Sequence, residues 1–322
     1  MPSASSEIGT IVTGKTGAYV GRFAPSPTGP LHFGSLLAAV ASYLQARTSD
    51  GRWLIRVEDI DPPREQAGAT TLILTALERY GFEWDGPVTY QSASRDAHDE
   101  AVAKLCDLDV AYCCGCSRRD LATASHGPLG LIYPGNCRNG SDAEDIAIRV
   151  RTTDRVMGFD DRLQGRQSQR LESESGDFVV RRRDGLIAYQ LAVVVDDHLQ
   201  GVTEIVRGID LMDSTPRQLW LQQLLGYREP AYVHIPVAVN AYGQKLSKSH
   251  GAGAVSLDSA RESLVAALTV LGQAPPPELA EASVSDIWAW ARENWDIGVL
   301  RGRTEIAVGD IPLARAGACP AA

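Results

Sequence analysis

Residues 21–35 read GRFAPSPTGPLHFGS, and this stretch predicts how the first part of the chain folds. An extended segment at 18–23 leads into a loop rich in proline and glycine, and apolar residues follow at helical spacing. We therefore expect a strand, a tight loop and a helix that begins near residues 32–35. A helix N-terminus carries unpaired N–H groups and a partial positive charge, so this arrangement suits a phosphate, to which His32 would donate. Gly34 would let a flat ring approach the backbone. An ordinary βα turn is the alternative interpretation.

The composition is typical of a globular protein. Of the 322 residues, 44% are hydrophobic and 22% are charged, and the length suggests about two domains. No apolar run is long enough to span a membrane, and the N-terminus lacks the basic-then-apolar order of a signal peptide. We therefore expect a cytoplasmic protein, and we expect it to be a monomer.

The net charge of −9 argues against a nucleic-acid partner, but the charge is unevenly distributed. Residues 149–183 contain nine arginines and six acidic residues, and the last three positions of the segment are all arginine. Such a segment suits a phosphate backbone, or it forms an ordinary solvated face. Composition alone leaves both interpretations open.

Residues 9–16, GTIVTGKT, match the P-loop pattern letter for letter. A working P-loop needs a buried strand before it and a helix after it. Only eight residues precede Gly9, and another extended segment follows Gly17. We therefore expect no P-loop function here.

The order of the expected elements predicts an α/β fold with a doubly wound, Rossmann-type parallel sheet. Strands are expected at residues 53–57, 203–207 and 232–239, and the apolar run at 191–195 is expected to resume the sheet pattern. Helices are expected at residues 64–80, 94–108, 215–225, 257–272 and 284–295. The alternation breaks down between about 100 and 185, which we interpret as an insertion.

Four cysteines of this insertion lie close together in the sequence, Cys113, Cys114, Cys116 and Cys137, whereas Cys106 and Cys319 stand apart. Without an export signal, a metal explains them better than disulfides do. Cys114, Cys116 and Cys137 would supply three thiolates to a structural zinc ion. The fourth ligand stays open among His126, Cys113 and Tyr133, and chemistry alone favours histidine or cysteine. Reduced cysteines without a metal are the alternative.

Two motifs that lie far apart in the sequence indicate a function when they are taken together. HFGS at 32–35 and KLSKS at 245–249 resemble the HIGH and KMSKS signatures of class I aminoacyl-tRNA synthetases. Formation of an aminoacyl adenylate spreads negative charge over phosphate oxygens, and each well-placed donor to such charge is worth about 10²–10³ in rate. Ser35 stands where the signature has its second histidine.

Longer strings narrow the resemblance to the glutamyl-tRNA synthetases. They are RVEDIDPPR at 56–64 and VVVDDHLQGVTEIVRGIDLMDSTPRQ at 193–218. Bacterial members of that family continue into a large helical anticodon-binding region. Here only residues 250–322 follow the lysine loop, the segment that contains KLSKS at 245–249. In this respect, and in its cysteine cluster, the chain resembles the glutamyl-Q tRNA(Asp) synthetases, which lack that region. Those ligases activate glutamate with ATP and attach it to the queuosine base in the anticodon loop of tRNA(Asp).

The resemblance implies a role for each matching residue. It assigns the glutamate pocket to Arg22, Ala24, Ser26, Glu58, Tyr189 and Arg207, with Glu58 holding the substrate ammonium. It assigns ATP, with its Mg²⁺, to His32, Gly34, Ser35, Lys245, Ser247 and Lys248, of which His32 and Lys248 are catalytic. It assigns zinc to Cys114, Cys116, Tyr133 and Cys137. The alternatives are a minimal glutamyl-tRNA synthetase that charges a tRNA 3′ end, a non-catalytic tRNA-binding paralogue and a P-loop NTPase.

The same resemblance implies six segments. They are a disordered N-terminus (1–17), the first half of the Rossmann catalytic domain (18–100), a zinc-containing insertion similar to an acceptor-binding domain (101–185), the second half of the Rossmann domain (186–242), the lysine loop with a helical region similar to a stem-contact domain (243–300), and a flexible tail (301–322).

Overall fold

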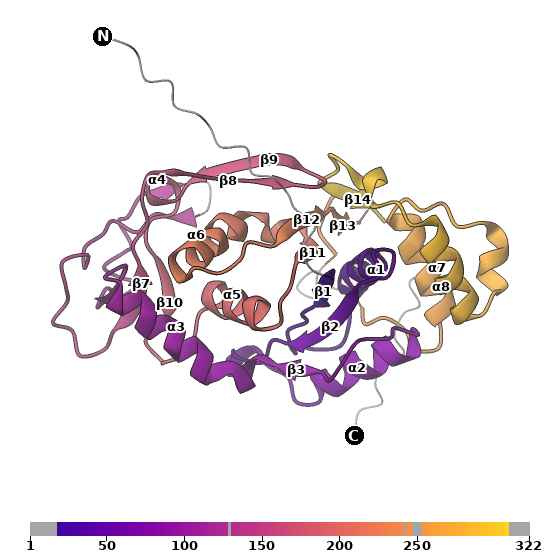
Figure 1. The fold of residues 1–322 in the computed structure, drawn as a ribbon, viewed down its shortest axis with the longest axis horizontal. Helices are drawn as coiled ribbons and strands as arrows, with labels where there is room; N and C mark the ends of the chain where they lie inside the picture. The colour runs from indigo at the N-terminus through magenta and orange to yellow at the C-terminus, as the bar shows by residue number, and fades with distance from the viewer. Residues whose placement is uncertain (1–17, 128–129, 241, 247–252, 309–322) are drawn as a thin grey trace, which may run out of the picture.

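Figure 1 shows the computed structural model of the chain, which describes residues 18–127, 130–240, 242–246 and 253–308. Three expectations lie outside these residues: the disordered N-terminus at 1–17, the P-loop match at 9–16, and the positions of Ser247 and Lys248. Within the described part of the chain, no helix has both the length and the apolar character needed to cross a bilayer.

A parallel sheet runs through the centre of the fold. β1 (Val20–Phe23) pairs with β2 (Arg52–Val57), and β2 pairs with β3 (Thr89–Tyr90). β11 (Glu204–Gly208) pairs with β12 (Ala231–Ile235), again in parallel. The N–H of Thr203 donates to the carbonyl of Val20 over 2.9 Å, so β11 lies on the other side of β1. The strand order β3-β2-β1-β11-β12 therefore grows outward from β1 in both directions, which is the doubly wound pattern that the sequence predicts.

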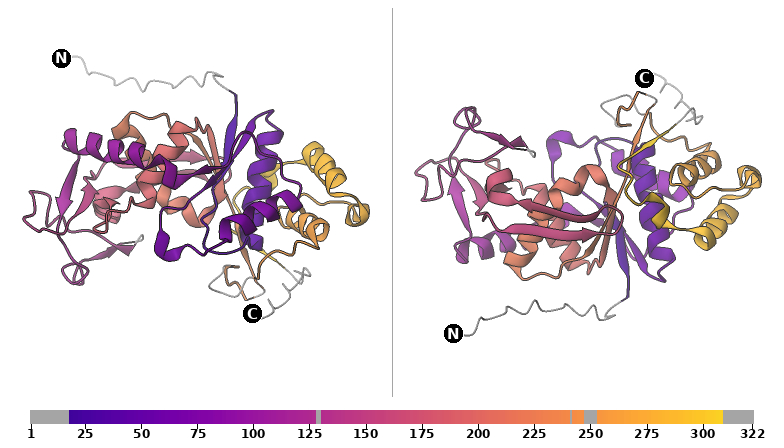
Figure 2. Two further views of the ribbon diagram at one scale, coloured as in Figure 1. Left: turned by 90° about the horizontal axis from the view of Figure 1, so that it is seen from below. Right: turned by 90° about the horizontal axis from the view of Figure 1, so that it is seen from above.

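Helices lie on both sides of this sheet. α1 (Phe33–Arg47) packs against β1, β2 and β11, whereas α5 (Tyr189–Leu199) and α6 (Thr215–Leu225) lie on the opposite side (Figures 1 and 2). α2 (Ala69–Arg79) and α3 (Arg95–Asp107) follow β2 and β3 in the chain. Short 3₁₀ turns join these elements at η1 (Pro62–Arg64), η2 (Gln91–Ser94) and η3 (Ile209–Ser214).

The apolar run at residues 191–195 belongs to α5, so the expectation that it resumes the sheet pattern was wrong. All seven residues from Leu191 to Asp197 are buried. Consecutive residues of a helix point in all directions, so this helix is packed on every side. The β-branched valines at 193–195 suggested a strand, but burial between α3, α6 and the sheet overrides that local preference.

Two other expected elements differ in their bounds. The helix expected over 64–80 begins only at Ala69. Gly68 adopts a left-handed conformation with φ of 77°, so a right-handed helix cannot continue through this residue. The strand expected over 232–239 is divided into β12 and β13 (Val237–Val239). Pro236 lies at the division, and its missing N–H prevents a continuous ladder.

The insertion contributes strands to three sheets. β4 (Ala111–Cys114), β7 (Ala147–Val150) and β10 (Phe178–Arg181) form an antiparallel sheet, beside a short pair of β5 (His126–Gly127) and β6 (Gly130–Leu131). The hairpin of β8 (Val156–Asp161) and β9 (Gly165–Arg170) instead extends the central sheet, because Tyr232 of β12 pairs with Asp161. The short helix α4 (Leu171–Glu174) connects this hairpin to β10.

The last described residues pack onto the first half of the fold. α7 (Ala260–Val270), η5 (Pro277–Glu281), α8 (Val284–Asn294) and η6 (Ile297–Leu300) follow the lysine loop. Trp288 of α8 meets Tyr43 and Phe82 in edge-to-face contacts, with ring centroids 4.8 and 4.9 Å apart. The segment expected to be a flexible tail from residue 301 contributes β14 (Glu305–Ala307), which pairs in parallel with β13.

Candidate active site and metal centre

The N-terminus of α1 holds His32 and Ser35 together. His32 is the N-cap residue, and its Nδ1 accepts a hydrogen bond from the backbone N–H of Ser35 over 3.2 Å. Its Nε2 lies 2.9 Å from Ser35 Oγ. Because Nδ1 accepts, a neutral ring carries its proton on Nε2 and donates it to the serine hydroxyl. Ser35 therefore fixes both the orientation and the tautomer of His32.

The two ends of the lysine loop lie against this turn. A Cβ atom at Gly34 would stand 3.3 Å from the carbonyl oxygen of Leu246, so the backbone passes close to the start of α1. On the other side of the loop, Ala254 forms a β-bridge with His32, and Val255 N–H donates to the carbonyl of Leu31 over 2.9 Å. The fold thus brings the two motifs of the sequence together.

Lys245, at the start of the loop, is engaged by an acidic residue of the sheet domain. Its Nζ lies 2.7 Å from Oδ2 of Asp210, which lies in η3 just after β11. Both side chains are about half exposed. This ion pair ties the lysine loop to the strand that carries Arg207.

A pocket opens at the carboxyl end of β2, beside the loop that follows β1. It is lined by three of the residues expected to bind glutamate, Ser26, Glu58 and Tyr189, and also by Gln91 and Arg182. The empty space of the pocket is about 650 Å³ when the open solvent at its mouth is included. The other expected residues, Arg22, Ala24 and Arg207, do not line its described walls.

Arg22 is buried behind the pocket and is already paired. Its Nε donates to Oδ1 of Asp197 over 3.1 Å, and Nη1 of Arg56 donates to the same oxygen over 2.7 Å. Burial opposes the ionisation of Asp197, but the two arginines outweigh it and hold the pKa of this carboxyl below its usual range. Arg22 therefore neutralises a protein carboxylate.

The charge of Glu58 is less fully compensated by neighbouring arginines than the charge of Asp197 is. Its nearest basic partner, Nη2 of Arg56, lies 3.4 Å from Oε1. Burial is the main influence on this carboxyl and raises its pKa, although Arg56 and Arg22 oppose that effect. An additional cation in the pocket would stabilise the ionised form of Glu58.

Arg207 is buried on β11 and has no acidic partner within salt-bridge distance among the described residues. Its Nε donates to Nε2 of His234 over 3.0 Å, and its Nη2 donates to Oγ1 of Thr215 over 2.8 Å. Its Nη1 is buried and lacks a hydrogen-bond partner in the described part of the chain. Burial raises the pKa of Tyr189, and the charge of Arg207 opposes that shift, so the guanidinium acts on the phenol that lines the pocket.

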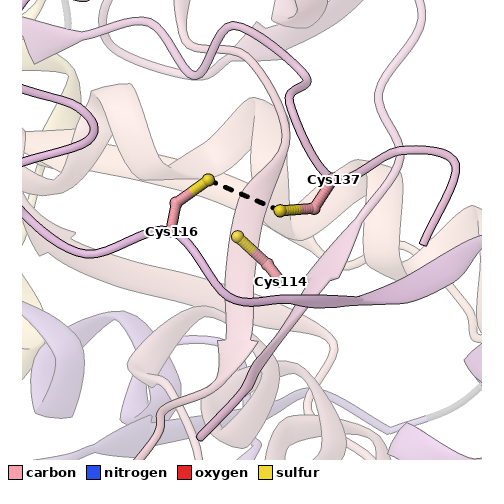
Figure 3. A group of neighbouring side chains, drawn as sticks. All are labelled: Cys114, Cys116 and Cys137. Atoms are coloured by element: carbon pink, nitrogen blue, oxygen red, sulfur yellow. Dashed lines mark hydrogen bonds between the residues drawn. The ribbon is translucent and has the colours of Figure 1, made fainter. Parts of the chain in front are cut away.

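The sulfur atoms of Cys114, Cys116 and Cys137 converge at one point of the insertion (Figure 3). All three lie within 4.8 Å of one another, and those of Cys116 and Cys137 are 3.4 Å apart. The hydroxyl of Tyr133 lies 3.4 Å from Cys114 Sγ and 3.5 Å from Cys116 Sγ. Four zinc ligands at a Zn–S distance of about 2.3 Å would be about 3.8 Å apart, so these donors fit a tetrahedral ion after a small adjustment.

The surroundings of this cluster favour negative charge on Cys137 but oppose it on Cys116 and Tyr133, whose pKa values are raised, chiefly by burial. Burial opposes the ionisation of Cys137, but hydrogen bonds, from Tyr133 first, outweigh it and lower the pKa of the thiol to about 7. Arg149 Nε donates to Cys114 Sγ over 3.2 Å, and its guanidinium stacks 3.9 Å from the centre of the Tyr133 ring. His126 and Cys113, the other candidates for a fourth ligand, are not part of the described cluster.

The arginine-rich segment at 149–183 is largely engaged with acidic residues. Arg181 pairs with Asp99, Arg182 with Asp61 and Arg183 with Asp145. Arg166 with Asp160 and Arg170 with Asp154 form pairs in which every side chain is more than half exposed, and such an exposed ion pair holds its partners by only about 0–1 kcal/mol. Within the described part of the chain, these arginines therefore pair with acidic side chains of the protein itself.

Sequence reasoning missed several buried polar residues around the pocket, chiefly Arg56, Asp197 and His234. Arg56 and His234 each lie within an otherwise apolar run, and Asp197 follows one directly, which is the only local signal that these residues are buried for a reason. Their partners lie far away in the chain, so the spacing of residues gave no indication of the pairs.

Comparisons with known proteins agree on one family. A family model described as "tRNA synthetases class I (E and Q), catalytic domain" matches residues 19–282. A relative from Dechloromonas aromatica (strain RCB), named Glutamyl-Q tRNA(Asp) synthetase, is 55% identical over 282 residues, which cover 86% of this chain and 94% of the relative. A relative of the same name from Pseudomonas aeruginosa is also 55% identical, over 87% of this chain and 94% of its own length.

Among solved structures, a glutamate tRNA ligase from Elizabethkingia meningosepticum, in complex with its amino acid, has a similar fold. The TM-score is 0.75, and the match covers 91% of this chain and 67% of that one. Sequence identity is 21%, so this likeness speaks for the fold alone.

Proposed function

The chain belongs to the class I tRNA synthetases for glutamate and glutamine, a family of ligases, and on that premise we propose that it activates L-glutamate with ATP and transfers the glutamyl group to the queuosine base in the anticodon loop of tRNA(Asp). One observation carries the activation step. The loop after β1 joins a pocket suited to glutamate to a helix N-terminus suited to a phosphate. The acceptor is proposed from the names of relatives whose length this chain covers to 94%.

In this proposal the two ends of glutamate meet opposite charges. The ammonium group lies against Glu58, whose ionised form gains from a cation because burial raises its pKa. The side-chain carboxylate accepts from Nη1 of Arg207, which has no hydrogen-bond partner among the described residues, and Tyr189 completes this end of the pocket. Ser26 lines the wall between them, and Arg22 and Ala24 support that wall from behind.

ATP lies at the N-terminus of α1. An oxygen of the glutamate α-carboxylate attacks the α-phosphorus, the bond to the bridging oxygen breaks, and pyrophosphate leaves with Mg²⁺. His32, held by Ser35, and the backbone at Gly34 face the phosphates, and we assign Lys245, Ser247 and Lys248 of the lysine loop to the same phosphates. An acceptor hydroxyl then attacks the acyl carbon and releases AMP. The side chains contribute donors that stabilise negative charge on the phosphates.

Zinc is proposed at Cys114, Cys116, Tyr133 and Cys137. Three thiols and one phenol converge at distances that suit a tetrahedral ion, and Arg149 compensates their negative charge. When bound, zinc would supply folding free energy on the order of 10 kcal/mol to this small subdomain. It lies away from the pocket-lining residues, so we assign it a structural role.

A transfer assay with three acceptors tests the proposal. Labelled glutamate, ATP and Mg²⁺ are incubated with the enzyme and with tRNA(Asp) that carries queuosine, tRNA(Asp) that lacks it, or tRNA(Glu). We expect stable label on the first alone. Label on tRNA(Glu) would identify a minimal glutamyl-tRNA synthetase. Absence of glutamate-dependent ATP–pyrophosphate exchange would point instead to a non-catalytic tRNA-binding protein.

Two lysine variants separate the nucleotide sites suggested by the sequence. If the lysine loop serves ATP, Lys248→Ala abolishes the exchange and Lys15→Ala leaves it unchanged. The reverse result would identify the P-loop match as the nucleotide site and overturn the proposal.

A further inference from the structure

A chain of three buried polar side chains runs behind the pocket, from the insertion to the sheet. Asp161 ends β8, His234 lies on β12 and Arg207 lies on β11. None of the three is more than 4% exposed. Oδ2 of Asp161 lies 2.7 Å from Nδ1 of His234, and Nε2 of His234 lies 3.0 Å from Nε of Arg207.

The partners of His234 decide its tautomer. Burial opposes the ionisation of Asp161, but hydrogen bonds from His234 and from the backbone of Gln164 and Leu163 lower the pKa of this carboxyl, so it is ionised and can only accept. Nδ1 of His234 must then carry a proton and donate it. Burial lowers the pKa of His234, which keeps the ring neutral and leaves Nε2 with a lone pair that accepts from Arg207.

Arg207 is consequently fixed by two of its three nitrogens. Nε is held by His234, and Nη2 by Thr215 Oγ1 at 2.8 Å and the carbonyl of Leu211 at 3.3 Å. Because the guanidinium is planar, these bonds also set the direction of Nη1. A buried N–H without a partner is unfavourable, and a ligand carboxylate would supply the missing acceptor.

We propose that Asp161 and His234 are positioning residues for the amino-acid substrate: they hold Arg207 in the one orientation in which Nη1 meets the substrate carboxylate, and so set the preference for glutamate over glutamine. This inference rests on the proposed function, in which Arg207 binds glutamate. It also gives the β8–β9 hairpin of the insertion a role at the pocket, because that hairpin supplies Asp161.

The preference for a carboxylate follows from the energy of the bond. A hydrogen bond between two charged groups is roughly twice as strong as one to a neutral amide, provided that its geometry is good. If the guanidinium of Arg207 tilts away from the substrate, the loss of binding energy is larger with glutamate than with glutamine. Loss of the positioning residues therefore reduces selectivity, whereas general destabilisation lowers the rate with both substrates alike.

Two substitutions of His234 divide its functions. In His234→Asn the amide occupies the place of Nδ1, so it can still donate to Asp161 but offers Arg207 no acceptor. In His234→Gln the amide reaches the place of Nε2 and can accept from Arg207. The measured quantities are kcat and KM for glutamate, glutamine and ATP in pyrophosphate exchange with the full-length enzyme. Tyr232→Phe, on the same strand, is the matched control, because its hydroxyl contacts Gln222 and not Arg207.

We expect His234→Asn to reduce the ratio of kcat/KM for glutamate to that for glutamine by about tenfold or more, chiefly through the KM for glutamate. The KM for ATP should stay unchanged, His234→Gln should restore most of the ratio, and Tyr232→Phe should retain it.

A wild-type ratio in folded His234→Asn overturns the inference. If that variant does not fold, Thr215→Val decides, because it removes the shorter of the two hydrogen bonds that hold Nη2 of Arg207 and leaves only the carbonyl of Leu211; an unchanged ratio in this variant also overturns the inference. Wild-type enzyme without glutamate-dependent exchange would overturn the proposed function, and this inference with it.

Discussion

Arg22 and Arg207 are both buried arginines next to the candidate pocket, but their surroundings give them different roles. Arg22 faces the carboxylate of Asp197, so its charge is already compensated. Arg207 is held by the neutral groups of His234 and Thr215, so among the described residues no carboxylate compensates its charge. A buried charge without a counter-ion is unfavourable, and a carboxylate ligand removes that penalty. The substrate carboxylate should therefore depend on Arg207 far more than on Arg22.

Arg207→Lys tests this difference. Lysine keeps the positive charge, but its single ammonium cannot contact His234 and Thr215 and also reach the position of Nη1. We expect the KM for glutamate to rise about 10- to 100-fold, with the KM for ATP unchanged, in pyrophosphate exchange. Arg166→Lys, at an exposed ion pair with Asp160, is the control and should behave as wild type. An unchanged KM for glutamate in Arg207→Lys would contradict the assignment.

At the residue scale, the sequence predicts some of the residues that line the pocket, but it does not predict the buried residues that support the pocket wall. Of the six residues that the family resemblance assigns to glutamate, Ser26, Glu58 and Tyr189 line the pocket, whereas Arg22, Ala24 and Arg207 do not. Asp197 and His234 are equally buried and polar, but their partners lie 175 and 27 positions away. Such contacts depend on how strands and helices are arranged in space, which residue spacing does not encode.

Among the elements, α5 shows where local preference fails. Its run of valines suggests a strand, yet Asp196 and Asp197 follow directly and are buried with it. Asp196 accepts from His98 of α3 over 2.9 Å, and Asp197 pairs with β1 and β2. Only a helix places two successive carboxylates toward different neighbours on the same side of a sheet. The elements with clear stops, such as α6 with Gly226 after it, were predicted correctly.

The cysteine cluster allows a prediction for the insertion as a folding unit. Cys137→Ser should reduce bound zinc from about one ion per chain to none and lower the thermal unfolding midpoint, because the metal supplies folding free energy that this small sheet lacks. Cys113→Ser is a matched control, since Cys113 is exposed on the same strand as Cys114 and is not part of the cluster. The measurements are elemental analysis and a melting curve. Zinc retained by Cys137→Ser, or absent from wild type, would exclude the assigned site.

For the whole molecule, the central feature is that segments distant in the sequence complete one another. β11 lies next to β1, the β8–β9 hairpin of the insertion extends the same sheet, and α8 packs on the aromatic rings next to α1. The sequence predicts the doubly wound order, because alternating strands and helices leave few alternatives. It does not predict that the insertion returns to the sheet, since antiparallel hairpins pair equally well within a separate subdomain.

Asp197 joins these distant parts electrostatically. It lies on α5, in the second half of the sheet domain, and pairs with Arg22 of β1 and Arg56 of β2 in the first half. Removing one partner of a buried ion pair typically costs about 3–5 kcal/mol, since the remaining charges stay buried. Asp197→Asn should lower the free energy of unfolding by about that amount at pH 7.

The effect of Asp197→Asn should also depend on pH, and its sign follows from the pKa of Asp197. Because the pKa is lower in the folded than in the unfolded chain, the carboxylate stabilises the fold fully above the unfolded value of about 3.9, and this contribution is lost as the pH falls below it. Glu58 acts in the opposite sense, since burial raises its pKa, and the charge of Asp197 adds to that shift, so Asp197→Asn also weakens this opposing contribution. Urea unfolding at pH 7, 5 and 3 should therefore show wild type and Asp197→Asn converging at the lowest pH. The exposed control Asp160→Asn should differ little from wild type throughout. A constant gap between wild type and Asp197→Asn would show that Asp197 acts through packing and not through its charge.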